Sequence, residues 1–183
     1  MTKISRLEDG EWMACTVPAV YAMPTEQSPV QRIVAGASTK DRRVFRALVR
    51  ILESPMFLLY VLHTPRGEGD AGRYQSPALS RADVESFLAR FEDYLCTDAR
   101  FDLWVHSPAK DATVVWDRHD VIHAYGPLAH FEREMLALGF EPGALPQGQE
   151  HAHHYRAECD DDACAVLAAF DWTRTELKPA DEQ

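Results

Sequence analysis

The stretch FDLWVHSPAKDATVVWDRHDVIHAY, residues 101–125, decides the fold, because its apolar residues recur in three short runs separated by two polar turns. In residues 101–106 every second side chain is apolar, which is the pattern of a strand with one face in the core. The two polar segments contain the Ser, Pro and Asp residues that favour turns. The stretch therefore predicts a meander of three antiparallel strands, at residues 101–106, 112–116 and 121–125.

Working outward from the meander, residues 56–62 are apolar throughout and predict a central strand, and residues 151–157 (HAHHYRA) predict one more. Four segments have apolar residues at three- and four-residue spacing and predict amphipathic helices, at residues 40–52, 81–95, 127–138 and 163–172. The second of these starts with Ser80 and has Asp83 at the capping-box position. We therefore expect an α+β fold, in which a mainly antiparallel sheet of four to five strands carries three to four amphipathic helices on one face.

A chain of 183 residues is most simply organised around one hydrophobic core. Residues 1–31 contain three prolines and few regular signals, which favours an N-terminal segment that wraps over the domain. The single α+β domain is expected at residues 32–177, and residues 178–183 are expected to be a disordered tail.

The formal net charge of −10 argues against binding to nucleic acid, because that binding depends on a basic surface that neutralises phosphates. The same charge disfavours binding to an anionic membrane surface. The longest apolar run is residues 56–62, too short to span a membrane, and residues 1–9 lack the apolar segment of a signal peptide. A cytoplasmic protein with reduced cysteines is therefore expected.

The run His151-Ala152-His153-His154 is the sharpest candidate for chemistry. On a strand, His151 and His153 project from one face and could bind a divalent transition metal together. A third ligand could come from Asp160 or from a histidine of the meander. The alternative is a polar surface strand, since none of the established zinc motifs is present.

The segment Asp117-Arg118-His119-Asp120-Val121-Ile122-His123 is dense in ionisable groups. His119 beside an aspartate could be an oriented general base, or His119 and His123 could bind a metal together with a carboxylate. The alternative is a polar hairpin turn, with His119 facing water and His123 half-buried and hydrogen-bonded.

Two further groups of residues are candidates for an interface or a ligand pocket. Arg42, Arg46 and Arg50 follow one another at one-turn spacing and form a basic ridge, which could dock a carboxylate or phosphate or could pair with surface acids. Trp104 and Trp116 lie on neighbouring predicted strands, where paired aromatic rings could line a pocket or could be covered by the N-terminal segment.

Two functions of different classes follow from these observations. The first is a non-enzymatic binding or regulatory protein, of immunity or adaptor type, whose acidic surface meets a basic protein partner or a second copy of the chain. It predicts an exposed aromatic patch rimmed by acids. The second is a small metal-dependent hydrolase or oxygenase, which predicts that His151, His153 and a third ligand converge at a site with an open coordination position.

Overall fold

The computed structural model describes residues 2–15, 17–37, 43–146 and 150–181, which form a mixed α+β fold. These residues contain twelve strands in two sheets and five α-helices. The prediction of four to five strands and three to four helices was therefore wrong in both numbers.

The larger sheet has nine strands and is antiparallel except at one edge, where the last two strands run parallel. The strands lie in the order β10 (Glu141–Pro142), β3 (Val20–Ala22), β4 (Arg32–Gly36), β9 (Val121–Tyr125), β8 (Ala112–Trp116), β7 (Phe101–Ser107), β5 (Phe57–Leu62), β6 (Gly72–Gln75) and β12 (Thr173–Thr175).

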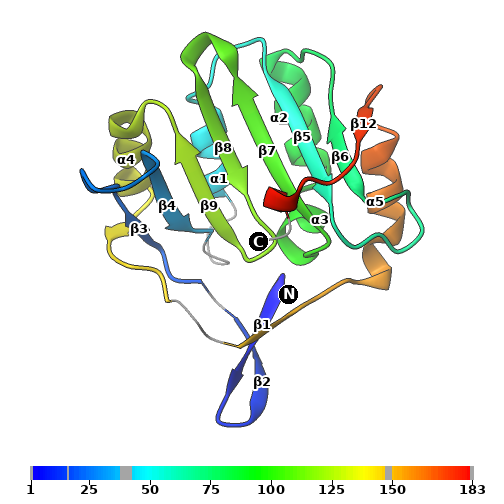
Figure 1. Ribbon diagram of the computed structural model, residues 1–183, viewed down its shortest axis with the longest axis horizontal. Helices are drawn as coiled ribbons and strands as arrows, with labels where there is room; N and C mark the ends of the chain where they lie inside the picture. The colour runs from blue at the N-terminus through cyan, green and yellow to red at the C-terminus, as the bar shows by residue number, and fades with distance from the viewer. Residues whose placement is uncertain (1, 16, 38–42, 147–149, 182–183) are drawn as a thin grey trace.

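The predicted meander lies at the centre of this sheet as β7, β8 and β9 (Figure 1). The strands predicted at residues 112–116 and 121–125 are confirmed, and β7 is one residue longer than predicted. Along β7 the buried and partly exposed residues alternate without exception, which is why the sequence pattern predicted it well.

Five α-helices pack against one side of the sheet (Figure 1) and share one core with it. They are α1 (Arg43–Val49), α2 (Arg81–Arg90), α3 (Glu92–Thr97), α4 (Leu128–Ala137) and α5 (Asp160–Leu167). Each contributes to a single cluster of buried residues that includes Phe45, Phe87, Tyr94, Phe131 and Val166. None of the described helices is long and apolar enough to cross a membrane.

The segment predicted as one helix at residues 81–95 is two helices. Its start is as predicted, because the Ser80 side chain accepts a hydrogen bond from the backbone of Asp83 and the Asp83 side chain accepts one from Ser80. Phe91 then leaves the helical conformation (φ −103°, ψ 14°) and separates α2 from α3. The side chain of Phe91, at this break, is buried in the core.

The smaller sheet has three strands, in the order β11 (His151–His153), β1 (Ile4–Glu8) and β2 (Glu11–Ala14). A two-residue turn joins β1 to β2, in which both Asp9 (φ 50°) and Gly10 (φ 84°) have positive φ. This geometry suits an Asp-Gly pair and a tight hairpin. The hairpin extends away from the larger sheet (Figure 1), and every residue of β2 is exposed.

The strands that the sequence did not predict are short, and several lie at sheet edges. β3 and β12 have three residues each and β10 has two, too few for an alternating pattern to be recognised. β2 and β12 are exposed along their whole length, so they lack an apolar face as well. Tertiary pairing rather than local pattern determines these strands.

The chain after β12 crosses the face of the sheet that is opposite the helices (Figure 1). Pro179–Asp181 form a 3-10 turn, and Asp181 is buried and paired with Arg73 of β6. In the N-terminal region, residues 4–14 belong to the smaller sheet and Val20–Ala22 to the larger one.

Candidate metal centre

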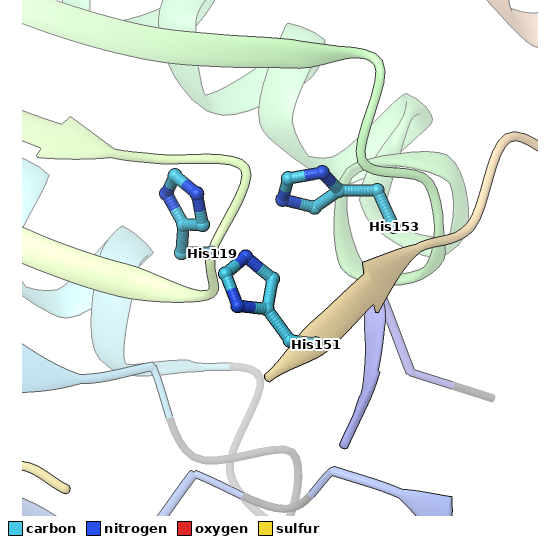
Figure 2. A group of neighbouring side chains, drawn as sticks. All are labelled: His119, His151 and His153. Atoms are coloured by element: carbon cyan, nitrogen blue, oxygen red, sulfur yellow. The ribbon is translucent and has the colours of Figure 1, made fainter. Parts of the chain in front are cut away.

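Three histidines from the two sheets point toward one another (Figure 2). His119 lies in the turn between β8 and β9, and His151 and His153 lie on β11. One nitrogen from each ring lies within 4.8 Å of the other two. The ring centroids are 5.1 Å apart for His119 and His151, 4.9 Å for His119 and His153, and 5.1 Å for His151 and His153. The three rings are close enough to share one ion.

Asp117 fixes the turn that presents His119. One oxygen of its carboxylate accepts hydrogen bonds from the backbone N–H of His119 at 2.9 Å and of Val121 at 2.8 Å. Asp120 completes the turn with a positive φ of 64°, a conformation that Asp tolerates better than most residues. The ring of His119 is therefore held on a rigid turn beyond the end of the sheet.

Alternation along β11 places His151 and His153 on one face of the smaller sheet. The next residue, His154, has its Nε2 2.7 Å from the Ser5 hydroxyl. The backbone N–H of His154 donates to the carbonyl of Lys3 at 2.8 Å. The pairing of β11 with β1 thus holds both histidines in place.

The separation of the nitrogens suits a transition metal. A tetrahedral zinc ion binds imidazole nitrogens at about 2.0–2.1 Å, so its ligand nitrogens lie about 3.3 Å from one another. Because the three histidine nitrogens already lie within 4.8 Å, each would move inward by only about 1 Å or less.

His153 is in the protonation state that a metal ligand needs. Burial, followed by the neighbouring charges of His119 and His151, lowers the pKa of His153 to about 4. The ring is therefore neutral at pH 7 and keeps a lone pair for a metal. Its Nε2 is buried and has no hydrogen-bond partner among the described residues, a costly situation that a bound ion would relieve.

Asp117 also lies near the ring of His119. Its second carboxylate oxygen is 3.9 Å from the Nδ1 of that ring. Burial alone would raise the pKa of Asp117, but the neighbouring side chains of His119 and His123 lower it well below its usual range. The carboxylate is therefore charged at pH 7. A carboxylate behind a ligating histidine orients the ring and makes it a better donor.

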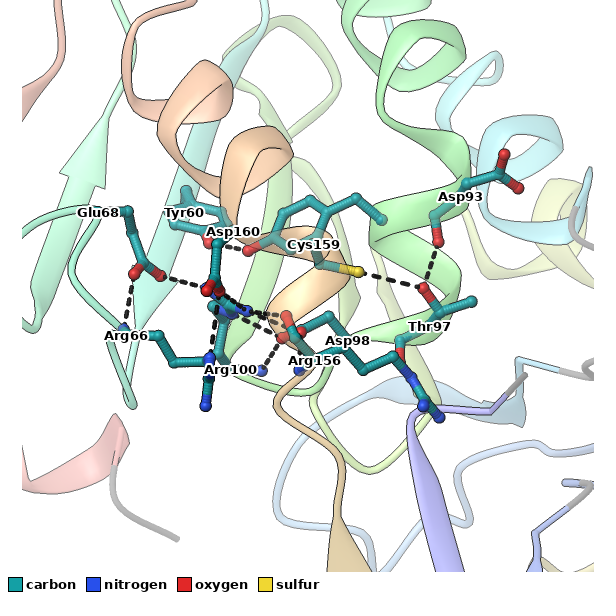
Figure 3. Close-up of polar contacts among 11 residues, drawn as sticks. Tyr60, Arg66, Glu68, Asp93, Thr97, Asp98, Arg100, Arg156, Cys159 and Asp160 are labelled. Atoms are coloured by element: carbon teal, nitrogen blue, oxygen red, sulfur yellow. Dashed lines mark hydrogen bonds and ion pairs between the residues drawn. The ribbon is translucent and has the colours of Figure 1, made fainter.

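The other two predicted ligands lie elsewhere. His123 turns its Nε2 toward the Asp117 carboxylate, at 3.2 Å, and is not part of the three-histidine group. Asp160 accepts hydrogen bonds from Arg66 at 3.1 Å and from Arg100 at 3.0 Å, within a separate polar network at the start of α5 (Figure 3).

The residues proposed for a pocket or interface do not form one surface. Trp104 pairs with Val115 and Trp116 with Leu103, so the two indoles lie on opposite faces of the sheet. The ring of Trp116 packs in the core, 5.4 Å from that of Phe45. Arg46 and Arg50 both pair with Glu85, and Arg42 lies outside the described residues.

Sequence reasoning missed several charged residues at this end of the sheet. The buried Nζ of Lys3 donates to the Asp117 carbonyl at 3.2 Å and lies 4.1 Å from the centroid of the Trp116 ring. Asp102 accepts from the backbone of Arg118 at 2.8 Å. No local pattern indicates these contacts, but the Asp9-Gly10 pair is a hairpin signal that could have located β1 and hence Lys3.

No protein-family model matches this chain, and comparisons with curated proteins and with solved structures found no match.

Proposed function

We propose that this protein binds a divalent transition metal, best matched by Zn²⁺, through His119, His151 and His153, and uses it to activate water for hydrolysis. The observation that carries the proposal is the convergence of three imidazole nitrogens within 4.8 Å, brought together from two sheets. The group leaves the buried Nε2 of His153 without a hydrogen-bond partner among the described residues, a cost that a bound ion would offset.

The number of ligands supports a catalytic rather than a purely structural centre. Structural zinc sites have four protein ligands, whereas catalytic sites have three and leave one position for water. A water molecule in that position ionises near pH 7 and becomes a nucleophile. His151 is exposed and His119 partly exposed, so solvent reaches this side of the site.

The ligand type favours hydrolysis over oxygen chemistry. Non-haem iron oxygenases use two histidines and one carboxylate. Asp160 is the carboxylate that could have completed such a set, and it is engaged with Arg66 and Arg100 instead. Three histidines with a carboxylate behind one of them resemble the ligand environment of hydrolytic zinc.

The metal content of the purified protein tests the proposal. Tag-free protein is grown in metal-supplemented medium, dialysed against a weak chelator and analysed by elemental mass spectrometry. We expect about one equivalent of a single metal, lost in the His151→Ala/His153→Ala double variant. His130→Ala is the matched control, because His130 is an exposed histidine on α4. Equal metal content in the double variant and the control would reject the proposal.

The hairpin of β1 and β2 favours a second candidate function, the binding of a basic protein partner. Trp12 is 51% exposed and lies directly opposite Leu7, which is 38% exposed. Glu8, Asp9 and Glu11 surround this apolar pair in the sequence of the hairpin. An aromatic anchor with acids around it suits a partner with an apolar contact and a basic rim.

A fluorescently labelled peptide rich in Lys and Arg, with one aromatic residue, is the probe for this function. Fluorescence anisotropy should show binding that weakens with salt and is lost in the Glu8→Gln/Glu11→Gln double variant. Glu134→Gln/Glu158→Gln removes the same charge from sites outside the hairpin and serves as control. Equal binding by both double variants would exclude the hairpin as the docking site.

A further inference from the structure

We propose that a cavity on the face of the larger sheet opposite the helices binds a flat, uncharged nitrogen heterocycle such as a purine base. The site is separate from the metal centre, because none of the three histidines of that centre lines the cavity.

The cavity lies on the side of the sheet that the helices leave open. Leu103 and Val105 of β7 are buried in the core shared with the helices, so the alternating residues Trp104 and His106 project from the other face. The cavity has a volume of about 420 Å³, within the range of about 300–1,000 Å³ typical of ligand pockets. Its lining side chains on four neighbouring strands are Gln75, Phe57, Leu59, Trp104, His106 and Thr113.

The register of the strands gives the shape of the site. Gln75 lies opposite Leu59, and Leu59 lies opposite Trp104, so these side chains form one row across the sheet. Phe57 and His106 oppose each other in the next row. Because neighbouring strands lie about 4.8 Å apart, the strands of Gln75 and Trp104 are separated by about 10 Å. That separation leaves room for one flat ring system between the indole and the amide, with apolar side chains beneath it.

The ring of Trp104 is supported from the side away from the cavity. Arg73 comes two residues before Gln75 on β6, which places it in the row on the far side of Trp104 from His106. Its guanidinium carbon lies 5.8 Å from the centroid of the Trp104 ring, and the guanidinium is held by an ion pair with the buried Asp181. The indole is thus a wall that is already ordered before a ligand binds, which lowers the entropy cost of binding.

Polar atoms around the cavity lack partners in the described part of the chain. The indole N–H of Trp104 is buried and has no acceptor there, a cost that an acceptor atom on a ligand would offset. The Nδ1 of His106 lies 2.9 Å from the Thr113 hydroxyl, so its Nε2 remains for a ligand. The exposed amide of Gln75 has no hydrogen bond to any described residue.

The chemistry of the lining favours a neutral heterocycle. None of the lining residues is Asp, Glu, Lys or Arg, so a charged ligand would lose hydration without gaining an ion pair. Phe57, Leu59 and Trp104 offer apolar surface that suits an aromatic ring. A carboxamide presents a donor and an acceptor side by side, which matches the adjacent acceptor and donor on the edge of adenine.

Isothermal titration calorimetry with the full-length protein tests the proposal. The probes are adenine, adenosine and adenosine 5′-monophosphate, together with indole, a ring of similar size that has an N–H donor but no ring acceptor. Gln75→Leu and Trp104→Leu are compared with two matched controls, Gln27→Leu and Trp12→Leu, which change the same residue types at exposed positions outside the cavity. Circular dichroism checks the folding of each variant, and because Gln75 is exposed its variant keeps the test decisive if Trp104→Leu fails to fold.

We expect adenine or adenosine to bind the wild type and both controls, more tightly than indole does. Gln75→Leu should weaken this binding by about fivefold to tenfold, and Trp104→Leu by about fivefold to 100-fold. Tighter binding of adenine identifies a free base as the ligand, and tighter binding of adenosine a nucleoside. The monophosphate should bind more weakly than adenosine, since no charged side chain lines the cavity.

Three results would overturn the proposal. The first is that neither adenine nor adenosine binds the wild type. The second is that indole binds as tightly as adenine, which would show that the ring edge is not recognised. The third is equal adenine binding by Gln75→Leu and Gln27→Leu. The metal content of the protein is measured separately, so each site can fail without the other.

Discussion

Replacement of Asp98 by Asn should destabilise the protein strongly, because this carboxylate is the centre of a buried polar network (Figure 3). Asp98 and Arg100 have fully buried side chains. The carboxylate accepts from the backbone N–H and Nε of Arg100 at 3.0 and 2.8 Å, from its Nη2 at 3.0 Å, and from the backbone N–H of Arg156 at 2.8 Å. Arg100 also pairs with the buried Glu68 at 3.0 Å and with Asp160. Each carboxylate thus balances part of the Arg100 charge. The network also joins the loop after β5 to the start of α5.

The size of the effect follows from what the substitution leaves behind. An Asn side chain keeps the shape, but its NH₂ group would face N–H donors, and it no longer balances the Arg100 charge. Removal of one partner from a buried ion pair typically costs about 3–5 kcal/mol. In a chain of this size each kcal/mol lowers the melting temperature by about 2–4 °C, so the loss should be about 6–20 °C.

Thermal and urea unfolding followed by circular dichroism measure this loss. Asp161→Asn is the matched control, because Asp161 is an exposed aspartate in the first turn of α5. The control should stay within about 0.5 kcal/mol of the wild type. If the free energy of unfolding of Asp98→Asn also lay within about 1 kcal/mol of the wild-type value, the network would not be a source of stability. That result would refute the reasoning.

Three further predictions concern other parts of the fold. Hydrogen bonds from Arg100 hold the pKa of Asp160 below 3.8, so the stability that Asp160 contributes is present above pH 3.8 and is lost as the pH falls through its lowered pKa. Urea unfolding should therefore separate Asp160→Asn from wild type at pH 6 and bring the two together at the lowest pH. Ser80→Ala removes the cap of α2 and should cost about 1 kcal/mol, which chemical denaturation would measure. Gly36→Ala would bring a methyl group to 2.2 Å from the carbonyl oxygen of Pro18. We expect faster proteolysis of the N-terminal segment, and unchanged digestion would show that this close approach is dispensable.

The sequence predicted best those elements whose pattern is local. β8 and β9 have the predicted bounds, and the cap of α2 forms as the Ser80 and Asp83 positions indicated. The sequence failed where partners distant in the chain decide the structure. β10 exists because residue 141 lies beside Val20, and β12 because residue 173 pairs with Gln75. No window of a few residues carries that information.

The same distinction applies to the candidate metal centre. His151 and His153 could be paired from the sequence because two residues on one strand share a face whatever the fold around them. Which residue stands opposite them could not be predicted, since it depends on how the smaller sheet docks on the end of the larger one. That docking is fixed by contacts at long range, among them the bond from buried Lys3 to the carbonyl of Asp117. His119, and not His123, lies beside the other two histidines. The Asp117 carboxylate accepts a hydrogen bond from the backbone N–H of His119 at the tip of the turn, whereas it contacts the ring of His123 directly. A metal bound there would join the two sheets, so metal binding and docking should stabilise each other by the same coupling free energy.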